Sequence, residues 1–142
     1  MQHILLATDG STCAAHATEV AATLAKAVGG RLSILTVGGH LSGDEVKQLA
    51  RAERDIGDAL DALSDQVLAH AKHHAQRVGV SDVKVQAGWG DPAEVIIETA
   101  RQQQVDANVK GRRGRGRLAG LLLGSVSQKV ASLAPCVVVL VP

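Results

Sequence analysis

Residues 111 to 127 combine glycines, serines and basic side chains in a pattern suited to binding phosphate. Gly111 and Gly114 stand three positions apart, and Gly124-Ser125 follows after nine further residues. Glycines let a ligand approach bare backbone N–H groups, and the first turn of a helix presents further free N–H groups to an anion. This segment is therefore predicted to bind a phosphate group.

The Gly124-Ser125 pair also predicts the start of a helix. Ser125 is a favourable N-cap, and Gln128 stands three residues later, which is the spacing of a capping box. A Walker A loop is excluded because no Gly-Lys-Ser/Thr sequence follows, and Gly114-Arg-Gly116 lacks the dinucleotide-binding spacing. The pattern thus predicts a phosphate loop of another type.

Alternating strand and helix patterns position this loop. Short apolar runs predict strands at 4–8, 32–37, 83–87, 105–109 and 137–141. Helical spacing and end signals predict helices at 14–28, at 42–78 and after Asp91, which would cap a helix with Pro92 at its first position. Strands joined by helices must be parallel, so the expected fold is a three-layer α/β/α sandwich around a five-stranded sheet.

Length and composition favour one domain over residues 1–142. A chain of 142 residues with 46% hydrophobic composition can bury a real core. No apolar run approaches the roughly 20 residues of a membrane span, and Met1 leads directly into a strand without a signal peptide's basic region. We expect a cytoplasmic protein without membrane insertion, with Cys13 and Cys136 far apart and reduced.

Aromatic content and charge argue against nucleic acid as a partner. Trp89 is the one aromatic residue, so no stacking platform for bases can be built, and the formal net charge is only +1. Positive charge is local, at Lys110, Arg112, Arg113, Arg115 and Arg117. These side chains either clamp a polyphosphate or form a solvated loop with one or two charges engaged.

The spacing Gly, two residues, Gly, nine residues, Gly-Ser resembles the ATP-binding signature of the universal stress protein family. The start at 3–11, the Gly90-Asp91-Pro92 turn and the closing segment 135–141 also lie where that family has them, so the resemblance covers essentially the whole chain. It implies a Rossmann-like sheet of strand order 3-2-1-4-5, related to the adenine nucleotide alpha hydrolases. It also implies ATP with Mg²⁺ as cofactor.

In a sheet of that order, ligands bind beyond the carboxyl ends of strands 1 and 4, where the winding reverses. The resemblance assigns Asp9 and the backbone near Ala7 and Val37 to adenine and ribose. It assigns the loop of Gly111 and Gly114 to ribose and phosphates. It assigns Gly124, Ser125, Val126 and Ser127 to the phosphates. The basic side chains of Lys110 and Arg113 are further candidates for phosphate binding because of their charge.

Some residues have alternative interpretations. Asp9 could instead serve as the N-cap of the first helix. Asn108 and Lys110 depart from the apolar pattern that the family has on this strand, so the amide needs partners and the ammonium must reach water or phosphate.

Three histidines, His70, His73 and His74, have the i, i+3, i+4 spacing that can place two metal ligands on one helix face, although a solvated face is the simpler interpretation. Trp89 and Cys13 are interpreted as packing residues.

Two function classes follow. The first is a nucleotide-binding regulatory module of the stress response, acting on an unknown protein partner. The second is a slow ATP hydrolase or adenylate-forming enzyme that uses the same cleft. Phosphoryl transfer needs metal-holding carboxylates and a group that positions water, and only the charge-neutralising donors are conspicuous, so binding is favoured. The apolar run 137–141, at a sheet edge in the family's strand order, predicts a homodimer.

Overall fold

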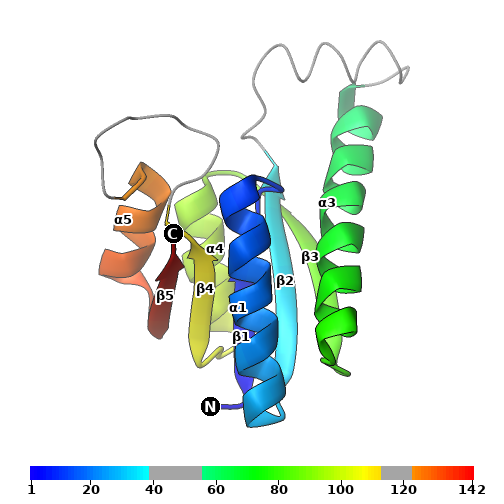
Figure 1. Cartoon of the computed structure of the whole chain (residues 1–142). Coiled ribbons are helices and arrows are strands. Elements are labelled where there is room, and N and C mark those ends of the chain that lie inside the picture. The colour runs from blue at the N-terminus through cyan, green and yellow to red at the C-terminus, as the bar shows by residue number, and fades with distance from the viewer. Residues whose placement is uncertain (39–55, 113–122) are drawn as a thin grey trace.

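The computed structural model describes residues 1–38, 56–112 and 123–142. Strands and helices alternate along these residues (Figure 1). The strands are β1 (His3–Ala7), β2 (Arg31–Gly38), β3 (Val83–Trp89), β4 (Ala107–Gly111) and β5 (Val137–Val141). The helices are α1 (Thr12–Val28), α3 (Ile56–Val78), α4 (Pro92–Gln102) and α5 (Ser125–Leu133). The predicted alternation of strands and helices is confirmed.

All neighbouring strands pair in parallel, in the order β3-β2-β1-β4-β5. This confirms the Rossmann-like α/β/α sandwich and the strand order that the resemblance implied. The chain first moves outward from β1 to β3 and then crosses back to β4. Because crossovers of this kind are right-handed, the change of direction moves α4 and α5 to the face opposite α1 and α3 (Figure 1). The winding therefore reverses between β1 and β4.

The sheet separates two hydrophobic clusters. Ile4 and Leu6 point toward α1 and α3, whereas Leu5 points toward α4 and α5, as expected from the period of two along a strand. All three side chains are fully buried. Alanines such as Ala17 and Ala21 supply much of the contact from α1, so the helix lies close to the sheet without any Phe or Tyr in the core.

Helix ends test the predicted caps. Asp91 caps α4 as expected, with its carboxylate accepting from the N–H of Glu94 at 3.0 Å. The predicted N-cap at Ser125 is wrong: Gly124 is the N-cap of α5, and Ser125 already belongs to the helix. The capping box does not form, because the N–H of Gly124 is held by the carbonyl of Arg112 at 3.1 Å and thereby fixes Gly124 at the cap.

The start of α1 excludes the alternative role of Asp9 as a helix cap. Ser11, and not Asp9, is the N-cap, and the Ser11 hydroxyl accepts from the N–H of Ala14 at 3.2 Å. Asp9 instead accepts from the N–H of Ser11 at 2.9 Å, within the turn that follows β1. Two good capping residues compete here, and the one nearer the helix takes the N-cap position.

Strand boundaries shift by a few residues. The fourth strand begins at Ala107 rather than at Val105, whose N–H donates to the carbonyl of Ala100 in the preceding turn. The third extends to Trp89, whose ring covers Gly38 on the neighbouring strand so closely that a Cβ there would lie 2.6 Å from the ring. Trp89 is thus a packing residue as predicted, although 52% of it remains exposed. The predicted helix start at Ser42 lies outside the described residues.

Candidate functional site

The carboxyl ends of β1, β2 and β4 lie side by side. In the sheet register Ala7 is paired with Leu35 on one side and with Lys110 on the other. Asp9 follows β1 by two residues, Val37 is the penultimate residue of β2, and Gly111 is the last residue of β4. The structure therefore brings together three of the segments from which the predicted site was built.

The turn after β1 holds Asp9 in a fixed orientation. The N–H of Thr8 donates to the carbonyl of Leu35 at 2.9 Å, which ties the turn to β2. The Asp9 carboxylate accepts from the N–H of Ser11, and Gly10 supports the sharp bend with a φ of 79° that most side chains would not tolerate. The partly buried carboxylate of Asp9 therefore lies just beyond the carboxyl end of the central strand β1.

Backbone hydrogen bonds fix the two ends of residues 111–127, called here the glycine segment. The N–H of Arg112 donates to the carbonyl of Val141 at 2.7 Å, and the carbonyl of Arg112 accepts from Gly124. The same carbonyl accepts from the hydroxyl of Ser127 at 2.7 Å. These bonds bring Gly124 and the start of α5 beside the end of β4, as the sequence predicted. Four further residues of the segment, Arg113, Gly114, Arg115 and Arg117, lie outside the described residues.

Lys110 is turned into the protein. It is only 8% exposed, and its ammonium donates to the carbonyl of Gly111 at 2.7 Å and to the hydroxyl of Ser127 at 2.6 Å. Burial lowers the pKa of Lys110, and the carboxylate of Asp9 opposes that shift. Sequence reasoning placed this ammonium in water or on a phosphate and missed the bond to Ser127.

The side chain of Ser127 is fully buried. Its hydroxyl accepts from Lys110 and shares its own proton between the carbonyls of Gly111 and Arg112, at 3.2 and 2.7 Å. Ser127 therefore links α5 to the end of β4. Ser125, by contrast, is exposed at the first position of α5, and Val126 is half-buried beside it.

Asn108 lies two residues before Lys110 and is fully buried. Its side-chain NH₂ donates to the carbonyl of Leu5 at 3.2 Å, but its side-chain oxygen has no hydrogen-bond partner among the described residues. The sequence indicated that a buried amide here needs hydrogen-bond partners. Among the described residues, the NH₂ group has a partner and the oxygen has none. An unpaired buried oxygen costs stability, so this strand carries a local penalty directly below the site.

The remaining candidates lie elsewhere. Within residues 1–38, 56–112 and 123–142, no three His, Cys, Asp or Glu side chains are grouped so that they could hold a metal ion. His74 instead bonds Glu19 across the α1–α3 contact. Cys13 and Cys136 are free thiols, and burial raises the pKa of Cys136. None of the helices in the described part of the chain is long and apolar enough to cross a membrane.

Comparison with known proteins agrees with this arrangement. The sequence profile of the universal stress protein family matches residues 1–142. The universal stress protein YxiE of Bacillus subtilis is 33% identical over an alignment 154 positions long that covers 97% of each chain.

Two solved structures share the fold. The universal stress protein UspA from Lactobacillus plantarum has a TM-score of 0.81 at 22% identity, covering 99% of this chain and 97% of that one. A universal stress protein in complex with cAMP has a TM-score of 0.75 at 27% identity, with the same coverage of the two chains. The chain belongs to the universal stress protein family.

Proposed function

We propose that this protein binds an adenine nucleotide, ATP with Mg²⁺, at the carboxyl ends of β1, β2 and β4, and acts as a regulatory module of the stress response. The observation that carries the proposal is the pair of hydrogen bonds from Gly124 and Ser127 to Arg112. The Arg112 carbonyl holds both Gly124 and Ser127, so the amino end of α5 is fixed next to the end of β4. A helix amino end placed in this way favours a bound anion.

The start of α5 supports a phosphate ligand in a second way. Gly124 has no side chain with which to cap the helix, and no side-chain hydrogen bond caps α5 in the described part of the chain. The N–H groups of the first turn, at Ser125, Val126 and Ser127, have no carbonyl partner within the helix. A phosphate group would supply the missing acceptors.

Lys110 favours the same class of ligand. Its buried ammonium donates to a carbonyl and a hydroxyl, which are both neutral acceptors. An ammonium removed from water is stabilised by a nearby negative charge, and Asp9 provides part of that charge. A phosphate bound at Gly111 and Ser127 would provide more. The ammonium would then stabilise the phosphate from inside the protein, next to Ser127, rather than from the solvent-exposed side.

The choice of an adenine nucleotide rests on the family. A relative of 27% identity is a universal stress protein in complex with cAMP. Asp9 and the backbone at Ala7 and Val37 would take the base and ribose, and Arg113 and Gly114 would complete the contacts to ribose and phosphate. Asp9 is the one acidic side chain among these site residues, whereas phosphoryl transfer needs several groups that hold a metal and position water. Binding is therefore favoured over turnover.

Calorimetry and thermal melting with ATP and Mg²⁺ test the proposal. At a hundredfold excess over its dissociation constant, ATP should stabilise the fold by about 2.7 kcal/mol, which raises the melting temperature by several degrees. Gly124→Val should abolish binding because its side chain blocks the phosphate, whereas Ser125→Ala removes one hydroxyl but keeps the backbone and should weaken binding less. Phosphate release under the same conditions separates a binder from a slow hydrolase. A folded parent without a melting shift at millimolar ATP would contradict the proposal.

A further inference from the structure

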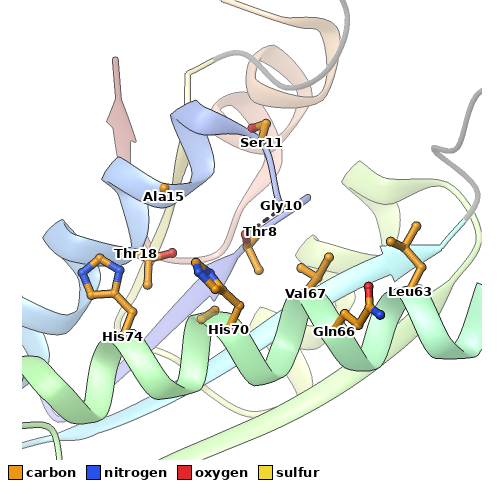
Figure 2. Close-up of a pocket in the computed structure, with 11 residues that line it drawn as sticks. Thr8, Gly10, Ser11, Ala15, Thr18, Leu63, Gln66, Val67, His70 and His74 are labelled. Atoms are coloured by element: carbon orange, nitrogen blue, oxygen red, sulfur yellow. Dashed lines mark hydrogen bonds between the residues drawn. The ribbon is translucent and has the colours of Figure 1, made fainter. Parts of the chain in front are cut away.

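A cavity of about 360 Å³ lies between α1 and α3, beside the end of β1 (Figure 2). It exists because α1 presents only short side chains here, among them Ser11, Ala15 and Thr18. Val67 and His70 face these residues from α3 without filling the space between the helices. Nearer the carboxyl ends of α1 and α3, alanines of both helices belong to the buried core.

This cavity is separate from the proposed nucleotide site. Ala7 belongs to the cluster beneath α4 and α5, and Lys110 reaches Ser127 on α5, so the nucleotide site lies on that face of the sheet. The cavity lies on the other face, against α1 and α3. Among the described residues, the two sites meet at the turn after β1, where Asp9 belongs to the proposed nucleotide site and Thr8 lines the cavity.

Among the described residues that line the cavity there is no Lys, Arg, Asp or Glu, and apolar side chains from Ala15 and Val67 form much of its walls. Burying an ionised group against such a surface without a counter-ion is unfavourable. The phosphates of a nucleotide therefore do not suit this cavity.

Polar side chains also line the cavity, among them Thr8, Thr18 and His70. Thr8 is 8% exposed and accepts from the N–H of Gly10 at 3.3 Å, so its own hydroxyl proton can still be donated. Thr18 donates to the carbonyl of Ala14 at 2.8 Å and keeps its lone pairs for a ligand. The ring of His70 points toward these two residues (Figure 2). Apolar walls with a few converging polar groups are typical of small-molecule sites.

We propose that this cavity is a second ligand site, which binds an uncharged, mainly apolar small molecule with one hydrogen-bonding edge. Its volume is at the lower end of the range for ligand pockets, so the ligand has one or two rings or an equivalent short chain. The apolar body lies between Ala15 and Val67, and the polar edge meets Thr8, Thr18 and His70. This proposal does not depend on nucleotide binding.

Indole is a suitable probe because it is neutral, bicyclic and has one N–H donor. Methyl NMR of the full chain should show saturable shifts for Val67, Leu63 and Ala71, which line the cavity. Indole-3-carboxylate has the same ring with a negative charge, and it should bind at least about tenfold more weakly because none of the described lining residues is a Lys or Arg that could pair with that charge. ATP should not displace indole.

Ala15→Leu is the test variant, because Ala15 is exposed on α1 and lines the cavity, so a longer side chain occupies it without disturbing the core. It should weaken indole binding by about tenfold or more. Ala27→Leu makes the same change at an exposed position of α1 that does not line the cavity, and it should bind indole like the parent. The proposal is overturned by the absence of saturable shifts, by equal binding of the carboxylate, by displacement with ATP, or by an Ala15→Leu variant that binds indole normally.

Discussion

Replacing Lys110 with Met would show whether the buried ammonium serves the ligand or only the fold. Methionine keeps an unbranched apolar stem and removes the charge. A hydrogen bond to a charged group contributes about 1.5–3 kcal/mol, and each 1.4 kcal/mol is a factor of ten in affinity, so ATP should bind roughly 10- to 100-fold more weakly. Adenosine, which has no phosphate, should bind the variant as well as the parent.

The fold should tolerate this change. The variant loses two charge-assisted hydrogen bonds, to Gly111 and Ser127. It also avoids the cost of burying an ammonium, which is several kcal/mol and opposes the loss. The hydroxyl of Ser127 can still donate to Arg112 at 2.7 Å, so α5 stays attached to β4. The free energy of unfolding should therefore stay within about 2 kcal/mol of the parent value.

The pH dependence of stability and of ATP affinity provides an independent test. Burial lowers the pKa of Lys110 in the folded protein below its ordinary value of 10.5. At pH values between the lowered pKa and 10.5, the unfolded chain therefore binds more protons than the folded chain. The stability of the parent should consequently rise relative to Lys110→Met as the pH increases toward 10.5. In the same window the parent should lose affinity for ATP, because the ammonium becomes neutral, whereas the affinity of the variant should stay flat.

Titration calorimetry with ATP and adenosine, together with urea unfolding at several pH values, measures these quantities. Equal weakening of ATP and adenosine binding would mean that Lys110 only shapes the part of the nucleotide site that holds the adenine base. A variant that binds ATP like the parent would refute a role for the ammonium in phosphate binding. A large loss of stability at neutral pH would show that the hydrogen bonds outweigh the cost of burial.

Three further predictions concern the basic segment, the strand below it and the sheet edge. Neutralising Arg112, Arg113, Arg115 and Arg117 together should weaken ATP more than adenosine in calorimetry, since only ATP offers phosphates to charge-assisted donors; equal losses would indicate a general distortion. Asn108→Leu removes the unpaired buried oxygen and should raise the free energy of unfolding in urea by about 1 kcal/mol; a loss would mean that the bond to Leu5 matters more. A homodimer is predicted through the edge strand β5, on which Val137 is 54% exposed, so the parent should have the mass of two chains in light scattering and Val138→Lys the mass of one. Val85→Lys on the opposite edge strand is the control, and a dimer that survives Val138→Lys would place the interface elsewhere.

The parts of the fold that could be predicted from sequence are those with local causes. The apolar run 137–141 gave the bounds of β5 directly, and Asp91-Pro92 marked the start of α4. The strand order could not be derived from such patterns and came from the family resemblance. The structure places Gly124 next to Arg112 at the end of β4, whereas the role of the glycines in phosphate binding and the contacts of Arg113 and Gly114 stay predictions.

The errors arose where distant residues decide a local structure. Ser125 has the right neighbours for an N-cap, but the bond from Gly124 to Arg112, twelve positions earlier, moves the cap by one residue. The direction of Lys110 depends on Ser127, seventeen positions later in the chain. A polar residue at the end of a buried strand was the available signal that something unusual lies there, yet it did not identify the partner.

The packing of Trp89 against Gly38 has a spectroscopic consequence. The chain has no Tyr or Phe, so its intrinsic fluorescence comes from this one indole ring. The ring lies at the carboxyl ends of β2 and β3, and Gly38 directly follows Val37. Emission from the unlabelled protein is therefore a single-site signal from the border of the proposed nucleotide site. A change in its wavelength or intensity can be assigned to that border without resolving a mixture of emitters.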